Sequence, residues 1–88
     1  MQEGSQPDYR IVIRKKVSKF FTIVPARDGE RIRAAIRNLA HDPRPPGCKK
    51  LTNSDEYRIR IGNYRVIYRV QDVIMIVFVE KIGHRRDI

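Results

Sequence analysis

The segment Tyr57 to Val70, YRIRIGNYRVIYRV, decides the fold of this 88-residue chain. Apolar and aromatic residues alternate with arginines on both sides of Gly62-Asn63. A period of two is typical of a strand that buries one face, and a Gly-Asn pair suits a tight turn between two strands. The segment therefore predicts a β-hairpin that turns at residues 62 and 63.

Pairing across a two-residue turn fixes which side chains share a face of this hairpin. Ile61 is expected opposite Tyr64, and Arg60 opposite Arg65. Because side chains alternate along a strand, one face should carry the apolar and aromatic residues Tyr57, Ile59, Ile61, Tyr64, Val66, Tyr68 and Val70. The other face should carry Arg58, Arg60, Arg65 and Arg69, interrupted only by Ile67.

The predicted pair of Arg60 and Arg65 points to a bound anion. Like charges directly opposed across two strands destabilise a sheet. A phosphate between two guanidinium groups reverses that repulsion, so the hairpin predicts a polyanion-binding surface, with RNA as the leading ligand. Two other interpretations stay open: a solvated arginine face partly neutralised by Glu80 or Asp55, or attraction of an acidic protein.

The segments before the hairpin predict one strand and two helices. Residues 9–14 are rich in β-formers. Apolar residues then recur at helical spacing over residues 17–24, and Pro25 ends that helix. Asp28 is expected to cap a second helix, whose apolar stripe is Ile32, Ala35, Ile36, Leu39 and Ala40.

The segment after the hairpin predicts a central strand. Gln71-Asp72 is expected to be a second two-residue turn, and Val73 to Glu80 is apolar on both faces. The expected fold is α+β, in the order β-α-α-β-β-β, with a helical hairpin packed on one face of a mainly antiparallel four-stranded sheet. Residues 1–7 are expected to be a disordered N-terminal end, and residues 8–88 a single domain.

Composition narrows the class of protein. Nineteen Lys and Arg against ten Asp and Glu give a net charge of +9, which attracts phosphate-rich partners. The single cysteine, Cys48, excludes an internal disulfide. The longest apolar run, Val73 to Val79, is too short to span a membrane. We expect a cytoplasmic protein with no membrane partner.

The C-terminal residues are expected to join the arginine face. A two-residue turn at Gln71-Asp72 would place Phe78 opposite Arg65 and deliver residues 83–86 to the same sheet edge. His84 is then the candidate for proton transfer, with a bystander role left open. No carboxylate pair accompanies a histidine cluster, so neither a metal nor another cofactor is expected. Cleavage would need the 2′-hydroxyl of RNA.

Three segments of the chain resemble the RelE/ParE toxin superfamily. They are GCKKL at 47–51, YRIRIGNYRVIY at 57–68 and IGHRRDI at 82–88. The resemblance implies the fold expected above. Its RelE branch implies a toxin that enters the ribosomal A site and cleaves mRNA there by 2′-hydroxyl attack, without a metal. It also implies contact with rRNA, and an inhibitory RelB-type antitoxin through which the toxin forms oligomers.

The resemblance implies roles for Arg58, Arg60, Arg65 and Arg85, and His84 joins them as the proton-transfer candidate named above. The residues expected to act in catalysis are Arg60, Arg65, His84 and Arg85, with Arg65 stabilising the transition state and Arg85 protonating the leaving oxygen. The residues expected to bind RNA phosphates are Lys49, Lys50, Arg58, Arg60, Arg69 and Arg86. The family pattern has lysines at positions 58 and 60. Because the pKa of arginine exceeds about 12, Arg60 is expected to be an electrostatic clamp rather than a base.

One further departure from the family pattern, and two alternative functions, remain open. A tyrosine that often follows the motif does not occur before Ile88, so His84 is a candidate to share its task. A ParE-like inhibitor of DNA gyrase, without nuclease activity, is the alternative function. A third possibility is a degenerate member that only binds its antitoxin. An acidic amphipathic antitoxin segment would contact exposed Phe20 or Phe21.

Overall fold

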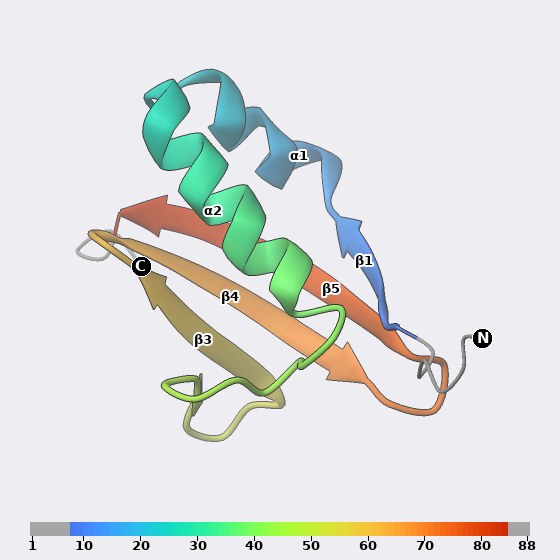
Figure 1. Ribbon diagram of the computed structural model, residues 1–88. Helices are drawn as coiled ribbons and strands as arrows, with labels where there is room; N and C mark the ends of the chain where they lie inside the picture. Colours follow the sequence, from blue (N-terminus) through green and yellow to red (C-terminus); the bar gives the residue numbers. More distant parts are fainter. Residues whose placement is uncertain (1–7, 85–88) are drawn as a thin grey trace.

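Residues 8–84, the part of the chain that the computed structural model describes, form a five-stranded sheet. Helices lie over one face of this sheet (Figure 1). The elements in chain order are β1 (Arg10–Ile13), α1 (Lys15–Ser18), the 3-10 helix η1 (Lys19–Thr22), α2 (Ala26–Asn38), β2 (Lys49–Lys50), β3 (Glu56–Ile61), β4 (Tyr64–Gln71) and β5 (Ile76–His84). None of the helices in this range is long and apolar enough to cross a membrane.

The strands lie in the order β1-β5-β4-β3-β2. β1 pairs with β5 in parallel, and all other pairs are antiparallel. The predicted α+β class and mainly antiparallel sheet are confirmed. The predicted strand number, four, is short by one because Lys49–Lys50 pairs with residues 57 and 58. Two residues are too few to show a strand period in the sequence.

The β3–β4 hairpin has the predicted register. Ile61 is opposite Tyr64, and Arg60 is opposite Arg65. Gly62 adopts a φ of +58°, the left-handed conformation that glycine adopts without strain. A Cβ atom on Gly62 would also lie 3.2 Å from a guanidinium nitrogen of Arg31. The hairpin prediction holds because the strand period and the turn residues point to the same structure.

The predicted turn at Gln71-Asp72 is wrong. β4 continues through Gln71, and residues 72–75 form the turn, closed by a bond from the Met75 amide to the Asp72 carbonyl. Phe78 therefore pairs with Arg69, and Gly83 lies opposite Arg65. The turn contains the exposed apolar residues Val73 (98% exposed) and Ile74 (59%). Because both residues are apolar, the sequence pattern predicts them as part of the strand.

The helices differ from the prediction at their ends. The helical stretch expected at 17–24 is divided into α1 and η1, neither longer than four residues. Asp28 is not the cap of the second helix, because α2 begins at Ala26, directly after Pro25. Proline, with its fixed φ, suits a position beside a helix start. Asp28 instead accepts a hydrogen bond from the Tyr64 hydroxyl, at 2.8 Å.

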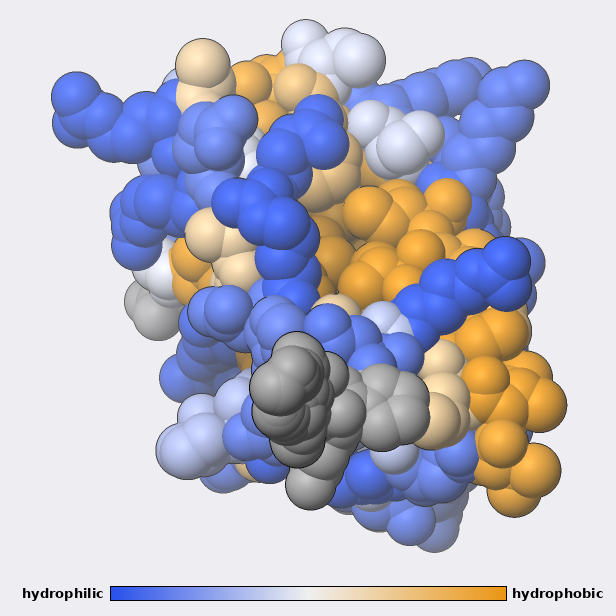
Figure 2. Space-filling view, turned by 45° about the vertical axis from the view of Figure 1, so that its right-hand side comes forward, coloured by the Kyte–Doolittle hydropathy of each residue, from blue (hydrophilic) through white to orange (hydrophobic). Residues whose placement is uncertain are grey.

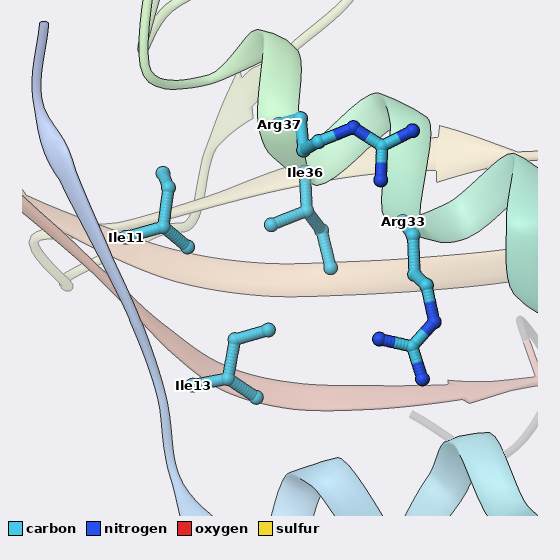
Figure 3. Close-up of a pocket in the computed structure, with 5 residues that line it drawn as sticks. All are labelled: Ile11, Ile13, Arg33, Ile36 and Arg37. Carbon is cyan, nitrogen blue, oxygen red and sulfur yellow. The ribbon is translucent and has the colours of Figure 1, made fainter.

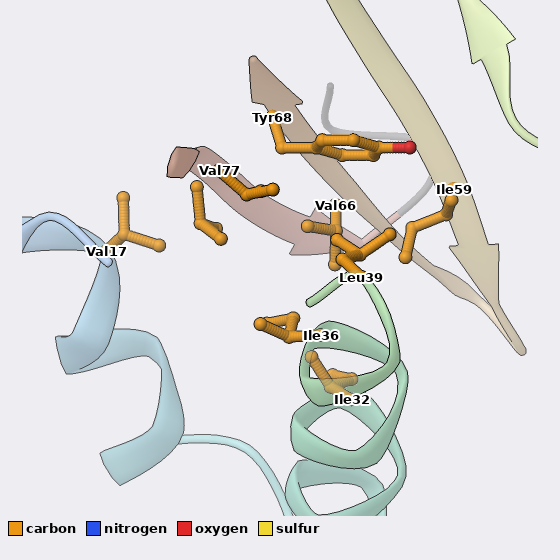
Figure 4. Close-up of a cluster of buried hydrophobic side chains, with 9 residues drawn as sticks. Val17, Ile32, Ile36, Leu39, Ile59, Val66, Tyr68 and Val77 are labelled. Carbon is orange, nitrogen blue, oxygen red and sulfur yellow. The ribbon is translucent and has the colours of Figure 1, made fainter. Parts of the chain in front are cut away.

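The core lies between α2 and the helix-covered face of the sheet (Figure 4). Three residues of the predicted α2 stripe, Ile32, Ile36 and Leu39, are buried. The other buried members of the core are Val17, Ile59, Val66, Tyr68, Val77 and Val79. The Tyr68 hydroxyl donates to the Pro43 carbonyl at 2.7 Å, and burial raises the pKa of this phenol. This packing leaves the opposite face of the sheet to polar side chains.

A basic cluster on the open face of the sheet

The open face is the side of the sheet that no helix covers. Because Ile59 and Val66 point into the core, alternation turns the intervening residues outward. Cross-strand partners share a face, and Lys49 is the partner of Arg58. We define the anion cluster as the cations that meet on this face at the hairpin: Lys49, Arg58, Arg60 and Arg65.

Arg58 is the buried member of the anion cluster, and the neighbouring arginines repel its charge. Its side chain is buried, with 8% of the residue exposed. Burial lowers its pKa, and the charges of Arg60 and Arg65 lower it further. Neither Arg58 nor Arg60 makes a side-chain hydrogen bond or ion pair within residues 8–84. An anion bound here would offset the mutual repulsion of these guanidinium groups.

Arg69 lies on the open face but outside the anion cluster. Its Nε donates to Glu80 Oε2 at 3.0 Å, and its guanidinium carbon lies 5.2 Å from the centre of the Phe78 ring. Arg14 Nε donates to the other carboxylate oxygen of Glu80 at 2.6 Å. Hydrogen bonds from Arg14 and Arg69 lower the pKa of Glu80. Glu80 therefore neutralises Arg69, as expected in the interpretation of a solvated arginine face that acidic residues partly neutralise.

His84 reaches the predicted sheet edge, but its side chain lies on the opposite face. It pairs with Tyr64, and the two rings are 5.7 Å apart on the helix-covered side. Nδ1 of His84 is buried without a hydrogen-bond partner in the described part of the chain. The predicted grouping of His84 with the arginines is thus not what the structure shows. Its catalytic role stays a prediction.

The remaining predicted site residues do not all lie on the open face. Lys49 joins the anion cluster opposite Arg58, whereas Lys50 pairs with Tyr57 and belongs to the other face. Arg85 and Arg86 lie outside the described residues. Among residues 8–84, no group of three or more His, Cys, Asp or Glu side chains could hold a metal ion.

The tip of the hairpin is supported by the helices. Asp28 accepts from the Tyr64 hydroxyl, the Phe20 ring packs edge-on to Tyr64 at 5.8 Å, and Arg31 covers the turn at Gly62. This support fixes the strand ends that carry the arginines. The sequence does not predict this support, because contacts between distant segments leave no local pattern.

A second set of contacts holds the far end of the sheet. Arg44 pairs with Asp72 at 2.9 Å and donates to the Tyr57 hydroxyl at 3.0 Å. The Tyr9 hydroxyl also donates to Asp72, at 2.7 Å. These bonds, that of Arg44 first, lower the pKa of Asp72 to about 2. They tie the proline-rich connection and the N-terminal strand to the β4–β5 turn.

Two hollows flank the helices. One, of about 240 Å³, lies between β1 and α2, with Ile11, Ile13 and Ile36 as its floor and Arg33 and Arg37 at its rim (Figure 3). The other, of about 530 Å³, is a groove lined by Lys16, Val17, Lys19, Phe20, Thr22, Ile23, Glu80, Lys81 and Ile82. Figure 2 shows apolar surface bordered by hydrophilic side chains. Both hollows are lined by apolar residues and by cations, and Glu80 adds one carboxylate to the groove.

Known proteins match nearly the whole chain. The family described as ParE toxin of type II toxin–antitoxin system, parDE, matches residues 13–88. The RelE1 toxin of Methanocaldococcus jannaschii is 33% identical over 81 residues, which are 88% of this chain and 90% of that protein. These matches extend across both the helices and the hairpin.

Solved structures agree with the fold. The archaeal RelE–RelB complex from Pyrococcus horikoshii OT3 contains a chain that matches with a TM-score of 0.81 at 31% identity, covering 89% of this chain and 96% of that one. The RelBE2 complex of Mycobacterium tuberculosis matches with a TM-score of 0.78 at 21% identity, covering 89% and 99%, which supports the fold alone. The chain therefore belongs to the ParE toxin family, within the RelE/ParE superfamily of toxins from type II toxin–antitoxin systems.

Proposed function

We propose that this toxin is a ribosome-dependent mRNA endoribonuclease that cleaves the codon in the A site. The observation that carries the proposal is the anion cluster, in which Arg60 faces Arg65 and Arg58 is buried without an acidic partner in the described part of the chain. A phosphodiester is an anion, so its charge is opposite in sign to that of these cations. The ribosome and its mRNA would place the site of action in the cytoplasm.

The chemistry that we propose uses the substrate's own nucleophile. The 2′-oxygen forms a bond to the adjacent phosphorus, and the bond from phosphorus to the 5′-oxygen breaks. The 2′-hydroxyl loses its proton and the 5′-oxygen gains one, leaving a 2′,3′-cyclic phosphate and a 5′-hydroxyl. Arg58 and Arg60 would hold the phosphate, and Arg65 would stabilise the charge of the transition state. Arg85 is the proposed acid for the 5′-oxygen.

Arg65→Ala tests this assignment. Removing one donor to a transition-state oxyanion costs about 10²- to 10³-fold in rate. Cuts in a ribosome-bound reporter mRNA, mapped by primer extension, should fall by that factor. Arg27→Ala is the matched control, because Arg27 is exposed on α2. Equal cutting by Arg65→Ala and wild type would refute the role of Arg65.

We also propose a RelB-type antitoxin as the inhibitory partner, through which the toxin would form oligomers. The complex from Pyrococcus horikoshii is named as RelE with RelB. In this chain, the 530 Å³ groove has an apolar floor that includes Phe20, and Ile23 at its side is 79% exposed. Lys16, Lys19 and Lys81 also line the groove, and with the one carboxylate of Glu80 they leave its lining net positive, which suits an acidic amphipathic segment.

Copurification tests the antitoxin proposal. A short acidic protein encoded beside this one should be retained by the wild-type toxin. Ile23→Glu should weaken that capture, because it places a charge of the wrong sign on the groove. A toxin that retains no such protein would contradict the proposal.

Inhibition of DNA gyrase is the second candidate function, because the matching family is described by ParE. Supercoiling assays with purified gyrase separate the two. Inhibition without mRNA cleavage would favour gyrase, and cleavage without inhibition would favour the ribosome. The anion cluster is the reason for placing RNA first.

A further inference from the structure

The cationic surface of the open face extends beyond the anion cluster. Arg69 lies four residues along β4 from Arg65, a separation of about 13 Å at the rise of an extended strand. Arg14 follows β1 at the sheet edge. A polyanion that crossed the whole face would meet these arginines as well.

Glu80 interrupts this surface. The ladder between β4 and β5 is irregular at residues 67 and 68. Ile67 pairs with Lys81 and Tyr68 with Val79, so Glu80 has no opposite residue. Such a bulge re-aims the side chain of the extra residue. The carboxylate of Glu80 accepts bonds from both Arg14 and Arg69, and its side chain is only 14% exposed.

We propose that Glu80 sets the boundary of the RNA footprint, confining phosphate contacts to the anion cluster and keeping Arg14 and Arg69 out of them. This inference rests on the proposed binding of RNA. The three groups together carry a net charge of +1 instead of the +2 of two arginines alone. A phosphate that approached either guanidinium would meet the negative charge of Glu80, whose largely buried carboxylate already accepts bonds from both.

The ion pair with Glu80, rather than distance, limits the part that Arg69 can play. At about 13 Å, Arg69 is farther from Arg65 than the Debye length of about 10 Å at 0.1 M salt. Arg58 is nearer, because it is the diagonal neighbour of Arg69 across β3 and β4, at about 7–8 Å. Glu80 accepts a hydrogen bond from Nε of Arg69 at 3.0 Å, and its negative charge offsets the field of Arg69 at the anion cluster.

The salt dependence of RNA binding measures the footprint. The logarithm of the binding constant falls with the logarithm of salt concentration by about 0.7 for each phosphate contact with a single strand. A short fluorescein-labelled single-stranded RNA is titrated by anisotropy with the wild type and with Glu80→Gln, at several KCl concentrations. Glu30→Gln is the matched control, because Glu30 is exposed on α2, away from the open face.

We expect a steeper slope for Glu80→Gln, by about 0.7 for each arginine recruited, and the wild-type slope for Glu30→Gln. Adding Arg69→Gln to Glu80→Gln should reverse part of the increase. Equal slopes for Glu80→Gln and Glu30→Gln, with RNA bound by the wild type, would overturn the boundary alone. A wild type that binds no RNA in a salt-dependent manner would overturn the boundary together with RNA binding.

Two single variants that retain Glu80 decide the question even where Glu80→Gln does not fold. Arg60→Gln removes a cation from the anion cluster and should lower the slope by about 0.7. Arg69→Gln removes the same charge outside the cluster and should leave the slope at the wild-type value. Equal reductions in both variants would show that Arg69 contacts phosphate, and the proposal would be wrong.

Discussion

Truncating Ile32 should destabilise the domain severely, because this side chain is completely buried between α2 and the sheet. Ile32→Ala removes three carbon atoms. At about 0.8 kcal/mol for each buried carbon, the lost transfer free energy is about 2.4 kcal/mol. The remaining cavity adds to that loss, and a total of about 3 kcal/mol lies within the range measured for such truncations. A domain of this size would lose about 12–24 °C in Tm.

Ile23→Ala supplies the matched control for this loss. The two variants have the same chemical change, but Ile23 is 79% exposed, so its truncation should alter the free energy of unfolding by less than about 0.5 kcal/mol. Both are measured by urea denaturation followed by circular dichroism. Equal destabilisation by the two truncations would refute the placement of α2 over the core.

Three other perturbations have defined outcomes. Tyr64→Phe removes the 2.8 Å bond to Asp28 and should cost about 1 kcal/mol in urea denaturation; an unchanged midpoint would contradict that bond. Hydrogen bonding, from Arg44 first, lowers the pKa of Asp72 from 3.8 to about 2, so its stabilising effect is present above pH 3.8 and lost as pH falls toward 2. Asp72→Asn should flatten the stability profile in that window, and a profile that kept its slope would exclude the carboxylate. Gly62→Ala forces a left-handed φ of +58° on alanine and should lower stability by about 1–2 kcal/mol, whereas an unchanged Tm would exclude that turn.

The hairpin could be predicted from the sequence because its signals are local. Alternation along residues 57–70 and the turn at Gly62 fix the register from Arg60–Arg65 outward. The next turn could not be predicted in the same way. Val73 and Ile74 are apolar but exposed, so their hydrophobicity indicated a strand where the chain turns.

The candidate site could be predicted only in part for a related reason. The meeting of Arg58, Arg60 and Arg65 follows from alternation together with the turn at Gly62. The ion pair of Arg69 with Glu80 joins β4 and β5. It depends on the irregular pairing of these strands, which no local sequence pattern predicts. The support of Tyr64 by a helix residue is also a long-range contact. Side-chain partners between segments require the tertiary structure.

The unpaired residue in β5, Glu80, also decides which of the residues that follow it face the core. Val79 faces the core, so in a regular strand residue 82 would turn outward and residue 84 would join the arginines. The extra residue, Glu80, reverses that order: Ile82 packs against the core, Gly83 lies opposite Arg65, and His84 lies beside Tyr64. Among relatives, the gain or loss of one residue at this point would exchange a bare glycine for an imidazole next to the guanidinium groups. A change in strand length, with no substitution, could thus alter the proton-transfer groups available to the same scaffold.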